Sequence, residues 1–297
     1  MAIGGNLPKH LEVAARTAVL GAQARDDMPY RLVADEVDLT AKSTTFVDLG
    51  GMPIPSQNPK VVESMIEKGK TVTPVDFYLT VSLSQNAIDD DQTGSLERRF
   101  ANVLPAFQRH INDLVFTYLN AGDGTTYGTS LTGLSLFNDA QIYPNAKNQT
   151  AQDNKYALAL SIDNFTTAWV AARQFKDDQS NYYNFDYKLL VCSPTLIREA
   201  ANITANQSAY DTANREENPF ARMGMSYLTV PQFDTTAWCL ISDAPMKPMF
   251  VAIRKRPELL SQDFEADAGE GGMWYWRYHG RYTVDYGDPL LAIMGNT

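Results

Sequence analysis

The chain has few side chains whose type and spacing suit binding or catalytic chemistry. Three consecutive carboxylates, Asp89-Asp90-Asp91, could hold a hard cation, because Ca²⁺ and Mg²⁺ prefer oxygen ligands. The spacing of an EF-hand loop is absent, and the run directly precedes a predicted helix. Negative charge at the start of a helix complements the helix dipole, so we interpret the run as a solvated acidic turn.

Two glycine-containing stretches are similar to known catalytic or binding loops but depart from them. Residues 122–128 follow a predicted helix rather than a strand, so their order is wrong for a dinucleotide-binding loop and favours a helix end and turn. Residues 128–132 have Thr132 where a nucleophile elbow requires glycine. We therefore predict no phosphate-binding loop and no catalytic serine.

The histidines and cysteines are too few and too scattered for a zinc site. His10, His110 and His279 lie far apart in sequence, and the two cysteines are Cys192 and Cys239. Each cysteine lies in an apolar run that is typical of a strand, so we expect both to be buried as small hydrophobic residues. The sequence predicts no catalytic residue, no metal site and no cofactor.

The charge balance limits the partners of the protein. The formal net charge is −10, which argues against a protein whose main task is to grip nucleic acid. It does not argue against enclosing DNA, because an acidic wall repels packed DNA. The one compact basic run, Arg254-Lys255-Arg256, could touch DNA, but we favour a contact between subunits. No membrane span and no secretion signal are expected.

Two adjacent segments have the strongest periodic patterns. Residues 75–84 alternate between apolar and polar side chains, which is typical of a strand with one buried face. Residues 92–119 repeat apolar side chains every three or four positions, which predicts a long helix with one apolar stripe. Pro105 lies inside this helix, so we expect a kink or a break there. We expect the helix to pack on the sheet that contains residues 75–84.

The second half of the chain alternates helix and strand patterns. Ser161 begins a predicted helix that ends at residue 175, and Ser193-Pro194 begins another that ends near residue 206. Residues 274–278 could be a nucleic-acid stacking platform, but we favour a strand with alternate rings buried. Strands are predicted at 187–192, 227–230, 237–241 and 249–254, and a hairpin at 273–278 and 281–286 that turns at His279-Gly280.

The first 74 residues have no apolar pattern sufficient for a core. Residues 6–24 predict an alanine-rich helix, and residues 40–74 contain prolines and glycines that interrupt short strands at 44–49 and 70–73. The second segment nonetheless has too many apolar side chains for a solvated loop, so it needs a surface to cover them. Those that we single out are Phe46, Leu49, Met52, Ile54, Val61, Met65 and Ile66.

The order of these elements resembles the HK97-like fold of tailed-phage major capsid proteins. Local motifs over residues 40–297 are similar, more narrowly, to the Mu-like major head subunit family. These motifs are Leu49-Gly50-Gly51-Met52-Pro53, the strand from Phe77 that ends in Ile88-Asp89-Asp90-Asp91, Asn112-Asp113-Leu114-Val115-Phe116, Ser135-Leu136-Phe137-Asn138-Asp139 with Tyr143-Pro144-Asn145, Lys188 to Pro194, and Lys247-Pro248-Met249-Phe250 with Arg254 and Pro257-Glu258. The tryptophans that flank the first motif in the family are missing here, and residues 1–40 match poorly.

The resemblance implies an α+β, HK97-like capsid fold. It implies an N-terminal arm over 1–40 and an extended β-hairpin loop over 41–75, whose apolar side chains would then contact a neighbouring subunit. A peripheral domain with the long spine helix would occupy 76–150, completed by strands within 247–286. An axial α/β domain would occupy 151–246, with 287–297 as a candidate completion.

The function that the resemblance implies is assembly rather than catalysis. Hexamers and pentamers of a major capsid protein would form an icosahedral shell around double-stranded DNA, without sequence-specific binding. The implied partners are further copies of the chain, a separate scaffolding protein, a portal and a decoration protein, in a virion assembled in the host cytoplasm. Two alternatives remain open: an encapsulin-type nanocompartment shell, and an unrelated enzyme with its site in the C-terminal half.

Overall fold

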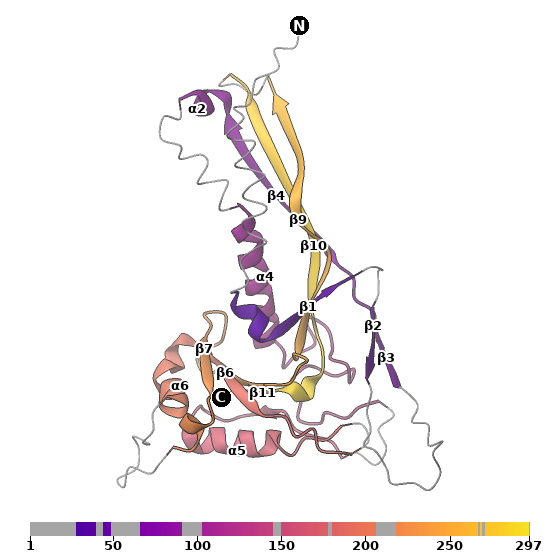
Figure 1. Cartoon of the computed structure of the whole chain (residues 1–297), viewed down its shortest axis with the longest axis vertical. Helices are drawn as coiled ribbons and strands as arrows, with labels where there is room; N and C mark the ends of the chain where they lie inside the picture. Colours follow the sequence, from indigo (N-terminus) through magenta and orange to yellow (C-terminus); the bar gives the residue numbers. More distant parts are fainter. Residues whose placement is uncertain are drawn as a thin grey trace.

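The computed structural model describes residues 28–39, 44–48, 66–90, 103–144, 150–177, 180–205, 218–266, 268 and 271–296. These residues form two mixed sheets, one of four strands and one of five, and a separate two-stranded hairpin. The four-stranded sheet and a long helix make the elongated upper part of the molecule, and the five-stranded sheet lies below with two shorter helices (Figure 1). No helix in these ranges is long and apolar enough to cross a membrane. The predicted helix at 6–24 lies outside the described residues.

The four-stranded sheet joins strands from the two ends of the chain. Its order is β1-β9-β10-β4, with bounds Ala34–Asp38, Met249–Glu265, Met273–Tyr286 and Val75–Ser84. The strand β1 is parallel to β9, and the other pairs are antiparallel. The predicted strand at 75–84 is confirmed as β4. Residues 28–39 belong to the body of this sheet, because η1 (Pro29–Leu32) leads directly into β1.

The prediction of a hairpin that turns at His279-Gly280 is wrong. Residues 273–286 form one continuous strand, β10, and the hairpin partner of β10 is β9, which is much longer than predicted. The pairing between β9 and β10 shifts register around Gly280, which packs against Pro257. A β-bulge accommodates a proline inside a strand, because the bulged residue needs no ladder hydrogen bond. Gly280 was therefore interpreted as a turn residue, although it lies opposite an irregularity in the partner strand.

The long helix α4 (Val103–Asn120) covers one face of this sheet. Its buried residues Phe107, Ile111 and Val115 pack against aromatic side chains of β10, which confirms the predicted packing of helix on sheet. The part of the predicted helix before residue 103 lies outside the described residues. Pro105 lies in the first turn of the described helix, and no break follows it. The preceding acidic run was expected to be a turn, but Asp89 ends a short helix, α2 (Gln85–Asp89).

The five-stranded sheet has its central strands buried on both faces. Its order is β5-β11-β8-β6-β7, with bounds Lys155–Tyr156, Ala292–Gly295, Trp238–Ser242, Tyr187–Cys192 and Ser226–Thr229. Helices α5 (Ile162–Ala172) and α6 (Ile197–Thr204) contribute buried side chains to the apolar cluster on one face. Every residue of β8 is buried, as expected for a strand that is covered on both sides.

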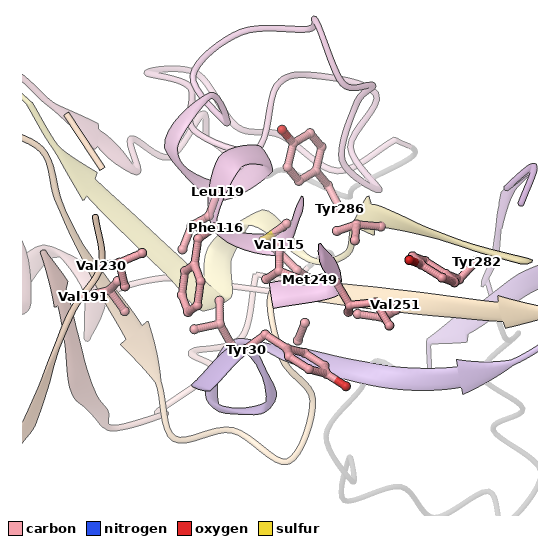
Figure 2. Close-up of a cluster of buried hydrophobic side chains, with 14 of the residues drawn as sticks. Tyr30, Val115, Phe116, Leu119, Val191, Val230, Met249, Val251, Tyr282 and Tyr286 are labelled. Atoms are coloured by element: carbon pink, nitrogen blue, oxygen red, sulfur yellow. The ribbon is translucent and has the colours of Figure 1, made fainter. Parts of the chain in front are cut away.

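One apolar cluster joins the two sheets at the C-terminal end of α4. Figure 2 shows Phe116 and Leu119 of the helix near Val191 and Val230, which come from the region of the lower sheet. Met249 and Tyr286, at the ends of β9 and β10, contribute to the same cluster. Each of these side chains is at most 3% exposed, so the two sheets share one continuous core.

We expect the Phe107→Ala variant to lower the free energy of unfolding by about 3–5 kcal/mol, because it removes a buried ring from the contact between helix and sheet. Arg109→Ala, at an exposed position of the same helix, should change it by less than about 0.5 kcal/mol. Urea unfolding of the unassembled subunit measures both. Equal midpoints for the two variants would show that the Phe107 ring does not stabilise this contact.

Candidate assembly surface

The predicted extended loop has a two-stranded stem. β2 (Thr44–Asp48) and β3 (Ile66–Lys70) pair antiparallel, with Thr44 opposite Lys70 and Asp48 opposite Ile66. The stem stands to one side of both sheets (Figure 1). The second strand was expected at residues 70–73, but it ends at Lys70, where the side chain binds the body of the subunit.

The structure describes the backbone position of two of the seven residues proposed to contact a neighbour, and the contact itself stays a prediction. Phe46 lies in the middle of the ladder, opposite Lys68, and Ile66 lies at one end of it, opposite Asp48. The other five, which are Leu49, Met52, Ile54, Val61 and Met65, lie outside the described residues. The anchorage of the segment can therefore be described, and its outer contacts stay a prediction.

The two ends of the segment meet in one small apolar cluster. Leu39, just before the predicted loop, and Val72, near the end of it, are both buried against Phe250 and Ala252 of β9. The Leu39 amide also donates to the carbonyl oxygen of Ile253 at 2.8 Å. The chain therefore lies on the body at the same place before and after the predicted loop, so the base of the loop is closed and fixed.

A buried ion pair fixes the returning strand. The Lys70 ammonium lies 2.5 Å from Oδ1 of Asp285, donates to the carbonyl oxygen of Tyr286 at 3.0 Å and also donates to that of Thr129. The Lys70 and Asp285 side chains are only 15% and 14% exposed. Burial lowers the pKa of Lys70 and raises that of Asp285, while the opposite charge of each partner offsets part of the shift. Nothing in the sequence indicated this pair, because its members lie 215 positions apart.

A second charged group fixes the outgoing strand. The Glu36 carboxylate of β1 accepts hydrogen bonds from the Tyr30 hydroxyl at 2.5 Å, from Arg31 at 2.8 Å and from Arg256 at 3.2 Å. Arg256 also binds Asp38 at 3.1 Å. Burial raises the pKa of Glu36, but the hydrogen bonds from Tyr30 and Arg256 and the charge of Arg31 outweigh it, so the pKa lies below its usual value.

The basic run at 254–256 has its contacts within the chain. Arg254 donates to the carbonyl oxygen of Leu39 at 2.8 Å, Lys255 pairs with Glu258 at 2.7 Å, and Arg256 binds the acidic side chains of β1. Within the subunit, the run holds the start of the extended segment on β9. The contact between subunits that was expected for this run stays a prediction.

The residues considered for catalysis do not meet. His110 contacts the Tyr282 hydroxyl at 2.8 Å, and His279 contacts Asp76 at 2.8 Å on a different face of the sheet. The Ser130 hydroxyl donates to a backbone carbonyl within its own loop. In the described part of the chain, neither histidine is hydrogen-bonded to a serine. These side chains therefore form no pair of nucleophile and general base there. His10 lies outside the described ranges.

The cysteines and carboxylates likewise form no metal site in the part of the chain that the structure describes. Cys192 and Cys239 are buried and free, as predicted, and burial raises the pKa of both thiols. No group of three or more His, Cys, Asp and Glu side chains in the described ranges could hold a metal ion. Asp89 and Asp90 end helix α2, and Asp91 lies outside those ranges.

The sequence of most of this chain matches a known protein family. The sequence model of a family described as phage capsid protein matches residues 67–290, which include all the strands of the four-stranded sheet except β1. The chain belongs to the phage capsid protein family. This capsid protein therefore functions as a shell subunit, and it has the HK97-like fold. No protein of curated function matches the sequence.

Solved capsids with the same fold share little sequence with this capsid protein. It is similar to a chain in the decorated capsid of bacteriophage JBD30, with a TM-score of 0.55 and 18% identity over 78% of this chain and 97% of that one. The capsid of an empty GTA particle gives a TM-score of 0.55 and 13% identity, over 92% and 91% of the two chains. A virus-like particle from Pyrococcus furiosus gives a TM-score of 0.51 and 9% identity, over 97% and 100%. These likenesses show the fold.

We expect Lys70→Met to lower the free energy of unfolding by about 1–3 kcal/mol, because it leaves the Asp285 carboxylate buried without its partner. The double variant Lys70→Met, Asp285→Leu removes both charges and should recover much of that loss. Urea unfolding of the unassembled subunit measures both variants. A double variant as unstable as the single one would show that the charge of Asp285 is not the cause.

We expect the Glu36 contacts to be sensitive to acid. Because the pKa of Glu36 is lowered in the folded subunit, its contribution is complete above the pKa of the unfolded chain and disappears as the pH falls through the folded value. Wild type should therefore be more stable than Glu36→Gln near neutral pH, and the difference should shrink below about pH 4. Thermal unfolding across a pH series measures this. A difference that does not change with pH would exclude ionisation of Glu36 as its origin.

Proposed function

We propose that this capsid protein is the major head subunit of a tailed phage of the Mu type, and that it acts by assembly without catalysis. The observation that supports this most directly is the closed base of the extended segment, where Leu39, Lys70 and Val72 hold both ends on the body. A long segment held firmly at its base, with apolar side chains along its length, suits a contact with a neighbouring subunit.

The extended segment would act as an arm over the adjacent subunit. Phe46, Leu49, Met52, Ile54, Val61, Met65 and Ile66 are the side chains that we propose for this contact. Their burial on a second copy would stabilise the shell, since apolar area removed from water contributes about 25 cal/mol per Å² before the costs of association are subtracted. A free subunit would leave the same side chains in water.

The two sheets would correspond to the two domains of the capsid fold. β4, β9, β10 and α4 would form the peripheral domain, and the pairing of β4 with β10 supports its completion by late strands. The five-stranded sheet would form the axial domain, and the pairing of β11 with β8 supports its completion by residues after 287. The N-terminal arm would then be confined to residues before η1, because β1 belongs to the four-stranded sheet.

The partners follow from the role of a head subunit. We propose hexamers and pentamers around double-stranded DNA, assembled in the host cytoplasm with a separate scaffolding protein and a portal. A decoration protein is a further candidate partner, because the similar JBD30 capsid is described as decorated with minor capsid protein trimers. The net charge of −10 supports enclosure of DNA rather than tight binding to it.

An encapsulin-type shell is the second candidate. Its support is the likeness to a virus-like particle from Pyrococcus furiosus, which at 9% identity concerns the fold only. The match to the phage capsid protein family favours the phage head instead. An unrelated enzyme is disfavoured by the same match, because this family is one of structural proteins.

The decisive variant removes the extended segment but keeps its base. Thr45 and Gly69 lie opposite each other in the ladder, so residues 46–68 can be replaced by a short Gly-Ser link without stretching the chain. Lys70 and Val72 stay in place. We expect a folded, soluble subunit that forms no shells, as observed by circular dichroism and negative-stain microscopy.

A longer deletion that extends to residue 72 is the matched control for the base. It removes Lys70 and buried Val72, so we expect it to unfold at a lower temperature than the shorter deletion. Normal closed particles from the shorter deletion would show that the arm is not needed for assembly. A shorter deletion that fails to fold would show that the segment belongs to the core.

A further inference from the structure

Among the described residues, the outer edge of β4 has no partner strand in the four-stranded sheet. β4 is the terminal strand in the order β1-β9-β10-β4. The strand has ten residues, VDFYLTVSLS, which are mostly β-branched, aromatic or otherwise apolar. Val75 and Tyr78 are 51% and 60% exposed. Such an edge is a template for pairing with another strand.

The opposite side of the same sheet has protected edges. Beyond residue 253 the edge of β9 contains Pro257, which cannot donate to a ladder, and the charged residues Lys255, Glu258 and Asp263. β1 has three acidic residues among its five. In β4 the one charged residue is Asp76, near its start, and it already contacts His279 and Arg281 at 2.8 and 3.7 Å. Of the described edges of this sheet, the edge of β4 is therefore the one that lacks the features that prevent pairing between edges.

The sequence of β4 is complementary to itself in the antiparallel direction. If two copies pair around a two-fold axis at Thr80, then Thr80 lies opposite Thr80 of the second copy, and Tyr78 lies opposite Ser82. Asp76 then lies opposite Ser84, so no like charges face each other. Directly opposed residues of an antiparallel pair lie on the same face of the sheet. The two-fold axis is then normal to the sheet, so both α4 helices lie on the same side of the joined sheet.

The other face of the pair would complete the burial of half-covered apolar side chains. Phe77, Leu79, Val81 and Leu83 pack against the core beneath α4 but stay partly exposed in the subunit. In the register centred on Thr80, Leu79 lies opposite Val81 and Phe77 lies opposite Leu83. Pairing would thus extend the apolar layer under each α4 helix across to the second copy.

We propose that β4 is a contact between two copies of this chain, paired antiparallel about a two-fold axis at Thr80. The proposal rests on the proposed function, because it places the second copy in the shell. It adds an isologous contact, distinct from the arm, that joins two four-stranded sheets into one. The occupant is another β4 strand rather than a different protein, because the edge complements itself in pattern and charge.

A cysteine at the axis tests the geometry. Thr80→Cys would place two thiols opposite each other at a separation that a disulfide can span. We expect shells of this variant to give covalent dimers after mild oxidation, as observed on a non-reducing gel. Ser261→Cys is the matched control, because Ser261 pairs with the same residue of β10, Arg277, but lies on the protected edge. It should stay monomeric on the gel.

A charge exchange tests the energetics. Thr80→Lys and Thr80→Glu each place two like charges at the axis, so either variant alone should lose shell formation while keeping its fold by circular dichroism. An equal mixture of the two variants pairs lysine with glutamate across the axis, and it should restore shells. Negative-stain microscopy counts the particles.

The outcomes separate this contact from the proposed function. If the wild type forms shells but Thr80→Cys gives no covalent dimers, the β4 pairing is wrong and the proposed function stands. The same holds if both charge variants assemble normally. Loss of shells in both variants without rescue in the mixture would also overturn the pairing, because the edge would then pair with a different segment. A wild-type chain that never forms shells would contradict the proposed function.

Discussion

The architecture depends on the burial of one end of one helix. The last turns of α4 insert Val115, Phe116 and Leu119 into the junction between the two sheets, where each is at most 1% exposed. A cluster at this density tolerates little change of shape, so it holds the two sheets at one angle. The Tyr286 hydroxyl, which donates to the carbonyl oxygen of Tyr118 at 2.7 Å, adds a directional contact to the apolar ones. A shell subunit needs this rigidity, because small errors in angle accumulate over many identical contacts.

The fixed junction gives the extended segment a firm base. β9 begins in the cluster at Met249 and, one residue later, supplies Phe250 to the small group that buries Leu39 and Val72. Asp285, which binds Lys70, immediately precedes Tyr286 of the same cluster. The segment is therefore attached directly to the core that the two sheets share. The position of its base is set by residues of the core.

Periodicity predicted the elements whose own residues decide their structure. The alternation in 75–84, the stripe that includes Phe107 and Ile111, and the apolar run at 187–192 all correspond to observed elements, because each buries one face or both. The length of β9 was missed because its second half is polar and contains Pro257. Its partner β10 supplies the hydrogen bonds there, and single-sequence patterns do not report a partner. The ion pair of Lys70 and Asp285 was missed for the same reason.

The pairing of β4 with β10 also limits how the chain can fold. Ser84 pairs with Met273, so the four-stranded sheet joins segments that lie far apart in the sequence and are synthesised at different times. Until β9 and β10 leave the ribosome, the apolar face of α4 and the inner face of β4 have no completed sheet to cover them. Such long-range pairing is slow and exposes sticky surface during synthesis. A nascent subunit consequently cannot display a finished four-stranded sheet, and assembly has to wait until β9 and β10 have been synthesised.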